Sequence, residues 1–128
     1  MSTDPRRTLG QLGESLAARH LEARGYEVID RNFRTRVGEL DLVVRDARSL
    51  VFCEVKTRIV RVAPSPFGPF AAVGPKKQQR VRAMAREWLA ARAARSGPRP
   101  EGLRFDAIGV SFDAGGRLLG IEHLEDAF

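Results

Sequence analysis

Residues 38–56 read Gly38-Glu39-Leu40-Asp41-Leu42-Val43-Val44-Arg45, then Asp46-Ala47-Arg48-Ser49, then Leu50-Val51-Phe52-Cys53-Glu54-Val55-Lys56. Two apolar runs of strand length, rich in β-branched residues, thus flank four residues that are typical of a turn. The segment predicts an antiparallel β-hairpin. The rest of the fold is expected to be built around it.

The register of this hairpin decides which side chains share a face. If the strands pair symmetrically about the turn, Asp41 lies opposite Glu54, and Glu39 lies opposite Lys56. Alternate residues of a strand point to the same face, so these four ionisable side chains share one face of the sheet. The other face is wholly apolar and carries Leu40, Leu42, Val44, Val51, Cys53 and Val55.

Two carboxylates that face each other across a sheet repel, and two arrangements would offset the repulsion. Asp41 and Glu54 could hold a divalent cation, because carboxylate, carbonyl and water oxygens suit Mg²⁺ or Mn²⁺. Alternatively, the ammonium group of Lys56 could neutralise them in a structural salt bridge with Glu39 or Glu54. Lys56 is one of only three lysines in the chain, and a compact ammonium can hold a water or a phosphate oxygen as a point charge. Spacing alone leaves both arrangements open.

Helical patterns flank the hairpin on both sides. The first follows a capping-box pattern at Thr8 and Gln11 and is expected to end at Gly25. The second places Trp88 on an apolar stripe, where it is expected to be a core residue. The expected elements are, in order, a helix over 9–24, strands over 26–34, 39–45 and 50–56, a helix over 76–95 and a strand over 103–112.

This order of elements predicts an α/β fold, with a mixed and mainly four-stranded sheet flanked by helices. The length of 128 residues suits a single domain, expected over 9–128 after a flexible arm over 1–8. Four prolines and two glycines interrupt any regular element before the second helix, so a long loop is expected over about 57–75. The segment after a turn at 113–116 is acidic, and no strand is predicted there.

Composition excludes several classes of protein. No run of residues approaches the roughly 18 to 20 apolar residues of a membrane span, and the first residues lack the apolar core of a signal peptide. We therefore expect a cytoplasmic protein with no membrane partner. Cys53 is the only cysteine, which excludes an internal disulfide and a thiolate zinc cluster. On the apolar face of the hairpin, Cys53 is expected to be a small core residue.

The charge balance points to an anionic partner. The chain carries 22 Lys plus Arg against 16 Asp plus Glu, with a net charge of +6 and a pI near 10.6. A pI above about 9 is typical of nucleic-acid-binding domains, and a solvated basic surface explains the same numbers equally well. Free backbone N–H groups at the start of the second helix favour phosphates. The side chains expected to contact phosphates there are Lys76, Lys77, Gln78 and Arg80.

The hairpin resembles the PD-(D/E)XK nuclease signature, with Asp41 as its aspartate and Glu54-Val55-Lys56 as its E-x-K motif. From about Leu9 to Val110 the chain is similar to the YraN-like uncharacterised protein family, which shares the restriction-endonuclease-like fold of archaeal Holliday-junction resolvases. The resemblance therefore predicts that fold. The further matching segments are Gly13-Glu14-Ser15-Leu16-Ala17-Ala18, Arg31-Asn32-Phe33-Arg34, Lys77 with Arg80, and Arg104-Phe105-Asp106.

The resemblance implies a metal-dependent nuclease that hydrolyses DNA phosphodiester bonds, including those of branched or damaged structures. Asp41 and Glu54 would ligate Mg²⁺ or Mn²⁺, together with the backbone carbonyl of Val55 and the helical Glu14. Lys56 would orient the attacking water and stabilise charge at the scissile phosphate. Without the resemblance, Glu14 is an ordinary solvated helix glutamate.

Partners and other functions follow from the same features. Arg58, just after the E-x-K motif, joins the expected phosphate contacts. DNA is expected rather than RNA, and symmetric cleavage of two strands would favour a homodimer. Two other functions stay open: a non-catalytic nucleic-acid-binding module that keeps the nuclease fold, and a protein-interaction module that uses the proline-rich loop. Phosphate-driven binding weakens as salt rises, which separates these two.

Three further polar residues are expected to be structural or exposed. Asp106 has apolar neighbours in sequence and is expected to hold Arg104 or a loop rather than a metal. His20 and His123 have no second histidine at ligand spacing and are expected at the surface.

Overall fold

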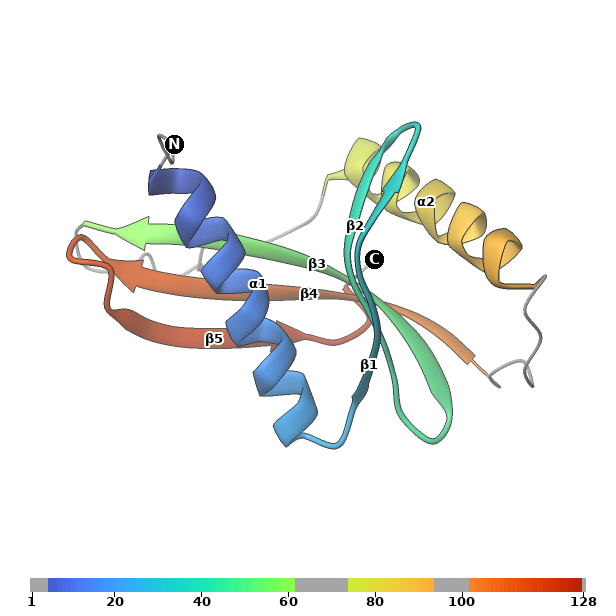
Figure 1. Cartoon of the computed structure of the whole chain (residues 1–128), viewed down its shortest axis with the longest axis horizontal. Coiled ribbons are helices and arrows are strands. Elements are labelled where there is room, and N and C mark those ends of the chain that lie inside the picture. Colours follow the sequence, from blue (N-terminus) through green and yellow to red (C-terminus); the bar gives the residue numbers. More distant parts are fainter. Residues whose placement is uncertain (1–4, 62–73, 94–101, 128) are drawn as a thin grey trace.

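Five strands form one mixed sheet, and one helix covers each of its faces (Figure 1). The computed structural model describes residues 5–61, 74–93 and 102–127. The elements are α1 (Pro5–Ala23), β1 (Glu27–Thr35), β2 (Gly38–Arg45), β3 (Ser49–Val60), α2 (Pro75–Ala93), β4 (Gly102–Asp113) and β5 (Leu118–Leu124). The strand order is β1-β2-β3-β4-β5, with β3 and β4 parallel and all other neighbours antiparallel. The α/β class and the mixed sheet flanked by helices are confirmed.

The predicted hairpin is formed by β2 and β3 in the predicted register. Its cross-strand pairs run from Arg45 with Leu50 to Leu42 with Cys53. The turn is fixed locally, because the Asp46 carboxylate accepts hydrogen bonds from two backbone N–H groups of the turn at 2.8 and 2.7 Å. An aspartate that bonds the backbone two and three residues further on is a common way to close a turn.

Beyond Leu42 the two strands diverge, so the ladder does not include the expected pair of Asp41 and Glu54. The alternation of β2 breaks at Asp41, because Leu42 packs on the α1 side of the sheet and Leu40 on the α2 side. In β1, Asn32 lies between the residues paired with Leu42 and Leu40 and has a φ of 51°. Asparagine tolerates this left-handed conformation better than most residues. β1 and β2 stay paired beyond this point while β2 leaves β3, so a fork opens between β2 and β3.

Two cores hold the helices on the sheet. The α1-side core comprises Ala17, Ala18, Leu21, Leu42, Val44, Val51, Cys53, Ile108, Val110 and Phe112. The α2-side core comprises Leu40, Val43, Leu50, Phe52, Val81, Met84, Ala85 and Trp88. Cys53 and Trp88 are core residues as predicted, and Leu40 does not lie on the face predicted for it. The Trp88 Nε1–H group donates to Asp30 Oδ2 at 2.9 Å, which satisfies the only polar atom of that indole.

The first helix starts earlier than predicted. It begins at Pro5, inside the segment expected to be a flexible arm, and runs through the capping-box pattern at Thr8. The fixed φ of proline suits the first helical turn, which explains this start. Gly25 has a φ of 94° and ends the helix as predicted.

The sheet is larger than predicted. β3 reaches Val60, inside the loop expected over 57–75, because it pairs with the parallel β4 over its whole length. The remainder of that loop, 62–73, lies outside the described residues. The acidic segment after the last turn forms β5, which pairs antiparallel with β4. In the described parts of the chain, neither helix is long and apolar enough to cross a membrane.

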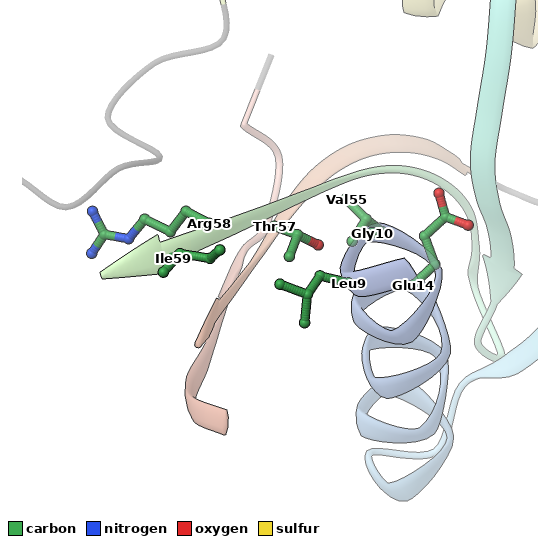
Figure 2. Close-up of a pocket in the computed structure, with 7 residues that line it drawn as sticks. All are labelled: Leu9, Gly10, Glu14, Val55, Thr57, Arg58 and Ile59. Atoms are coloured by element: carbon green, nitrogen blue, oxygen red, sulfur yellow. The ribbon is translucent and has the colours of Figure 1, made fainter. Parts of the chain in front are cut away.

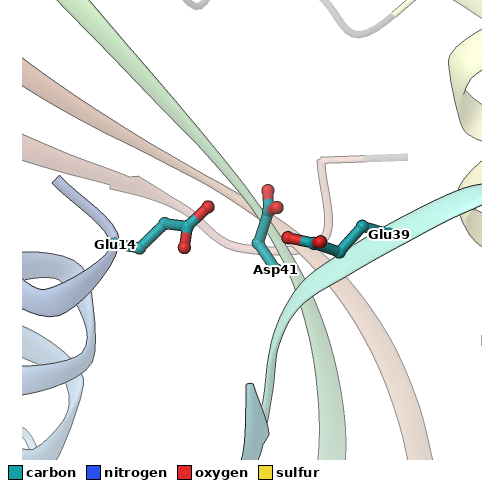
Figure 3. Close-up of side chains that lie close together, drawn as sticks. All are labelled: Glu14, Glu39 and Asp41. Atoms are coloured by element: carbon teal, nitrogen blue, oxygen red, sulfur yellow. The ribbon is translucent and has the colours of Figure 1, made fainter. Parts of the chain in front are cut away.

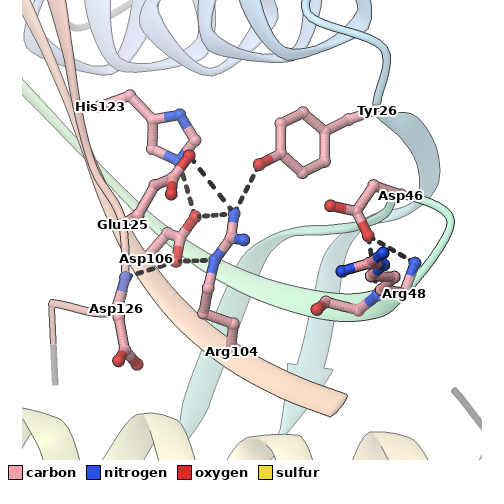
Figure 4. A network of polar contacts seen from close by, with 9 residues as sticks. Tyr26, Asp46, Arg48, Arg104, Asp106, His123, Glu125 and Asp126 are labelled. Atoms are coloured by element: carbon pink, nitrogen blue, oxygen red, sulfur yellow. Dashed lines mark hydrogen bonds and ion pairs between the residues drawn. The ribbon is translucent and has the colours of Figure 1, made fainter. Parts of the chain in front are cut away.

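A buried polar network joins β4 to β5 (Figure 4). Arg104 donates to both carboxylate oxygens of Asp106 at 2.9 Å, as predicted. The ring Nε2 of His123 lies 2.6 Å from Asp106 Oδ2, and this side chain is buried, so its predicted surface position is wrong. His20 is half-buried rather than exposed. A buried carboxylate needs donors, and the unpredicted strand β5 supplies one of them.

Gly13 marks the closest approach of α1 to β3. A Cβ added at Gly13 would collide with the hydroxyl of Thr57 and lie 3.3 Å from its Cβ, whereas a Cβ at Gly10 would meet nothing within 4 Å. Alanine normally stabilises a helix interior relative to glycine by about 0.5 to 1 kcal/mol. We therefore expect Gly10→Ala to stabilise the protein and Gly13→Ala to destabilise it by about 1 to 3 kcal/mol.

Chemical denaturation of both variants measures this difference. Adding Thr57→Ala to Gly13→Ala should recover part of the loss, because it removes the colliding hydroxyl. Equal effects at the two glycines would contradict the close approach of the helix.

Candidate active site

Three carboxylates converge at the fork between β2 and β3. Glu14 comes from α1, and Glu39 and Asp41 come from β2; their oxygens lie within 4.8 Å of one another (Figure 3). We call these three residues the carboxylate cluster. The side-chain amide of Asn32 in β1 donates to Glu14 at 2.8 Å and to Glu39 at 2.7 Å. One amide group thus orients two of the three carboxylates.

Asp41 is the most perturbed member of the cluster. It is half-buried, and its Oδ2 accepts a hydrogen bond of 2.8 Å from the backbone N–H of Val55. Burial, followed by the negative charges of Glu54 and of the other cluster carboxylates, raises the pKa of Asp41 to about 8, although the hydrogen bond from Val55 lowers it. Burial and the neighbouring carboxylates therefore disfavour the ionised form of Asp41.

Glu54 lies beside the cluster and is held by the second helix. Its side chain is 11% exposed, and its Oε1 lies 2.6 Å from Nζ of Lys77 at the start of α2. Its charge still reaches the cluster, because it contributes to the raised pKa of Asp41. Lys77, expected as a phosphate contact, therefore neutralises an expected metal ligand in this structure.

Lys56 does not form the structural salt bridge that the spacing left open. In the described part of the chain this half-buried side chain makes no ion pair within 4 Å. Glu39 bonds Asn32 and lies 3.7 Å from the Arg34 guanidinium, and Glu54 pairs with Lys77. The register places Lys56 beyond the last β2–β3 pair, where the strands have already diverged.

The remaining predicted residues lie on either side of the cluster. Lys76, Gln78 and Arg80 occupy the first turns of α2, and Lys76 and Arg80 are exposed. Arg58 lies on β3, and its Nε donates to Ser111 Oγ at 3.3 Å. The structure thus brings together Glu14, Asp41, Glu54 and Val55, and it distributes the expected phosphate contacts between α2 and β3.

A pocket of about 410 Å³ opens next to Glu14, between the start of α1 and the end of β3 (Figure 2). Pockets of this size can hold a small ligand or part of a larger one. Its walls combine apolar side chains with one carboxylate and one guanidinium. The lining residues are Leu9, Gly10, Glu14, Val55, Thr57, Arg58 and Ile59.

The donor set of the cluster fits a hard divalent cation. Glu14, Glu39 and Asp41 offer oxygen ligands from two separate elements, and Mg²⁺ and Mn²⁺ prefer such carboxylate ligands with water in the remaining positions. A cation would also offset the charge that raises the pKa of Asp41. Glu39 was expected as a partner of Lys56 and joins the cluster instead.

Asn32 is the site residue that the sequence analysis missed. It lies in a matching segment, and no role was assigned to it. The available signal was a polar residue with a tolerance for left-handed backbone, between the apolar residues Ile29 and Phe33 of a predicted strand. Only the fold shows that this residue faces Glu14 and Glu39.

The sequence of this chain is similar to those of known proteins. Residues 13–110 match the family described as Uncharacterised protein family UPF0102. A UPF0102 protein of Streptomyces griseus subsp. griseus is 50% identical over 105 residues, which cover 82% of this chain and 83% of the relative. A UPF0102 protein of Pelotomaculum thermopropionicum is 40% identical over 126 residues, which cover 98% of each chain.

Among solved structures, SfsA of Pyrococcus furiosus in complex with Ca²⁺ aligns with a TM-score of 0.36 and 18% identity, over 94% of this chain and 63% of SfsA. The family assignment rests on the sequence matches, which cover most of the chain at 40% identity or more in both relatives. The chain belongs to the UPF0102 family, which is the YraN family that its hairpin and helices resemble.

Proposed function

We propose that this protein is a metal-dependent nuclease with a restriction-endonuclease-like fold, which hydrolyses phosphodiester bonds of DNA. The observation that carries the proposal is the convergence of Glu14, Glu39 and Asp41 within 4.8 Å at the fork of the sheet. Acidic groups that approach so closely repel unless a cation or protons separate them. The same repulsion between carboxylates contributes to the raised pKa of Asp41.

The arrangement of elements supports the nuclease. An aspartate on β2 and a Glu-x-Lys motif on β3 lie where these strands diverge, and α1 adds a glutamate from one face. This is the order in which the resembled nuclease signature places its acidic and basic groups. Fold alone does not assign an activity, so the proposal depends on the side chains at the fork.

The chain's own residues have distinct tasks in this proposal. The carboxylate cluster would hold Mg²⁺ or Mn²⁺ together with Glu54 and the backbone carbonyl of Val55, and Asn32 would fix the orientation of Glu14 and Glu39. When bound, such a cation polarises the phosphate, acidifies a water and stabilises the leaving alkoxide. Lys56, which no carboxylate of the described chain neutralises, would orient that water and offset charge at the phosphate.

The nucleic-acid surface would extend along the start of α2. Lys76 and Arg80 are exposed there, and a net charge of +6 favours approach of a polyanion. The backbone N–H groups of the first helical turn favour phosphate as well.

One observation favours a second candidate function. The ion pair of Glu54 with Lys77 at 2.6 Å occupies a carboxylate that the nuclease would use for its cation. A protein that keeps this pair permanently would bind nucleic acid without cutting it. Cleavage assays separate the two functions directly.

We expect the protein to cut labelled linear, nicked, flapped or four-way-junction DNA in Mg²⁺ or Mn²⁺ and not in EDTA. Asp41→Asn and Glu54→Gln should each lower the rate by at least about 100-fold, the usual effect of removing a group that stabilises charge in the transition state. Glu22→Gln, on the exposed surface of α1, is the matched control and should cut like the parent.

Gel analysis of the products and anisotropy of the same labelled DNA give the two readouts. Cleavage that persists in Asp41→Asn would contradict the site. Binding without cleavage by every variant would establish the non-catalytic module instead.

A further inference from the structure

Glu54 is a buried carboxylate with one cationic neighbour in the described part of the chain. Its side chain is 11% exposed, and the ammonium of Lys77 lies 2.6 Å from its Oε1. The other buried carboxylate, Asp106, has polar contacts with two side chains and with one backbone N–H group. Glu54 therefore depends on one ammonium group for the compensation of its charge.

This ion pair and Glu14 lie on opposite faces of the sheet. Phe52 belongs to the α2-side core and Cys53 to the α1-side core, so alternation along β3 places Glu54 on the α2 side. Glu14 reaches the fork from α1 instead. Among the described residues, the carboxylates whose oxygens lie within 4.8 Å of one another do not include Glu54. The structure thus shows Glu54 paired with α2 rather than joined to the cluster.

Glu54 is nevertheless close enough to the cluster to share a cation with it. The next residue, Val55, donates its backbone N–H to Asp41 at 2.8 Å, which joins β3 to the cluster at this point. After burial, the negative charge of Glu54 is the largest cause of the raised pKa of Asp41. A divalent cation between these two carboxylates would relieve their repulsion. That cation and the ammonium of Lys77 therefore compete for Glu54.

Lys77 has an alternative partner once a cation takes Glu54. Its side chain is 39% exposed in the first turn of α2, which contains no acidic residue. Lys76 and Arg80 are exposed on the same turns. An ammonium group among cations and free backbone N–H groups is suited to a phosphate. Without a cation, the same move would leave Glu54 charged, buried and unpaired, which is strongly unfavourable.

We propose that Lys77 is an exchangeable counterion that couples the binding of the divalent cation to the binding of DNA. Without the cation, Lys77 pairs with Glu54; when the cation binds, Glu54 turns to it and Lys77 contacts a phosphate. We call this step the counterion exchange. Each ligand then raises the affinity for the other by the same factor, because coupling between two sites is reciprocal. The inference rests on the proposed nuclease function and adds a residue that links its two ligands.

Binding of Mn²⁺ alone tests the competition. Electron paramagnetic resonance of free Mn²⁺ measures the affinity without DNA. Lys77→Met removes the competitor and should tighten Mn²⁺ binding about 5-fold to 150-fold, the usual range of coupling between two sites. Lys76→Met is the matched control, because it removes the same charge from the same helical turn, where Lys76 is exposed. It should change the Mn²⁺ affinity less than about threefold, since salt screens exposed charges.

Lys77→Arg should have the opposite effect at the same position. It keeps the charge, so Glu54 stays paired and the fold is preserved. A guanidinium holds a carboxylate through two parallel hydrogen bonds, more firmly than an ammonium does. Mn²⁺ binding should therefore weaken at least about threefold. An Mn²⁺ affinity that stays at the parent value in Lys77→Arg would overturn the counterion exchange, whether or not Lys77→Met folds.

The salt dependence of DNA binding tests the contact with phosphate. Fluorescence anisotropy of a labelled duplex is measured over a range of salt, in EDTA and in Ca²⁺, and gels of the same samples show that the DNA is intact. Lys77→Met should lower the slope of log K against log salt by about one unit in Ca²⁺ and leave it unchanged in EDTA. Lys76→Met should have the same effect on the slope in both conditions.

The outcomes separate the counterion exchange from the proposed function. If Lys77→Met lowers the slope equally in EDTA and in Ca²⁺, or in neither, the counterion exchange is wrong while metal-dependent cleavage at the cluster can still stand. If the parent binds no Mn²⁺ and cuts no DNA, both the counterion exchange and the proposed function are wrong.

Discussion

Replacing Asp106 by asparagine is expected to lower the free energy of unfolding by about 3 to 5 kcal/mol, because it removes the buried counterion of the partly buried Arg104 guanidinium. Asp106 is fully buried and receives donors on both oxygens. Arg104 contacts both oxygens, His123 contacts Oδ2, and the Asp126 N–H donates to Oδ1 at 2.9 Å. Asparagine keeps the shape but turns one acceptor into a donor that faces other donors.

The same network makes the free energy of unfolding depend on pH. Burial raises the pKa of Asp106, but the hydrogen bonds from His123, Arg104 and the Asp126 amide outweigh it and hold the pKa below the ordinary 3.8. A lowered pKa in the folded state stabilises the protein above the unfolded-state value and loses that effect as pH falls through the folded-state value. The parent should therefore lose stability below about pH 4, and Asp106→Asn should lose less.

Denaturant unfolding at pH 7 and at pH 3 measures both effects. Asp126→Asn is the matched control, since Asp126 contributes only its backbone N–H to the network and asparagine accepts its φ of 52°. That variant should stay within about 0.5 kcal/mol of the parent. A loss below about 1 kcal/mol for Asp106→Asn would show that the network does not hold β5 on the sheet.

Removing the charge of Asp41 is expected to raise the free energy of unfolding, in contrast to the loss expected at Asp106. Asp41→Asn should stabilise the metal-free protein at pH 8 or above, because it removes one of several carboxylates that repel one another. Asparagine can still accept the hydrogen bond from Val55 through its carbonyl oxygen. Because solvent reaches this half-buried group and screens the repulsion, the expected gain is about 1 to 3 kcal/mol.

The sign of the pH dependence follows from the raised pKa. Asp41 keeps its proton in the folded protein up to about pH 8, whereas its unfolded value is 3.8. Between these values the folded state binds more protons, so the stability of the parent falls as pH rises and levels off above about pH 8. Millimolar Mg²⁺ or Mn²⁺ should raise the melting temperature in this range, since a ligand of the native state stabilises it.

Thermal melts at pH 5, 7 and 9, with EDTA or with Mg²⁺, measure these effects. Asp41→Asn should show a flatter pH profile and a smaller response to Mg²⁺, and Asp126→Asn should behave as the parent does. A parent whose melting temperature changes neither with pH nor with Mg²⁺ would contradict the charge concentration at the cluster.

Local patterns were enough to predict the two helices, the first four strands and the central register. The β2–β3 turn depends on the Asp46 carboxylate and on two backbone N–H groups that donate hydrogen bonds to it, all within four residues. Alternation then determines which residues of the two strands face α1, as Leu42 and Cys53 do. Gly25 ended the first helix as predicted for the same reason, because its conformation depends on its own backbone.

Elements that depend on distant partners were missed. β5 is held by pairing with β4 and by the contact of His123 with Asp106, and its own sequence has little strand signal. β3 extends to Val60 because the parallel β4 continues beside it. The start of α1 at Pro5 was missed for a different reason: the capping pattern at Thr8 competed with a proline that suits the first helical turn.

The sequence by itself determined the α/β class and the hairpin register from Arg45 with Leu50 to Leu42 with Cys53, because these follow from alternation and from a turn closed within four residues. Only the tertiary structure decided which carboxylates meet. Asn32 has a left-handed backbone at the point where β2 leaves its ladder with β3. Glu39 and Asp41 meet Glu14 of α1 there, and Lys77 of α2 reaches Glu54. Such contacts depend on the relative placement of helices and strands, which no local periodicity encodes.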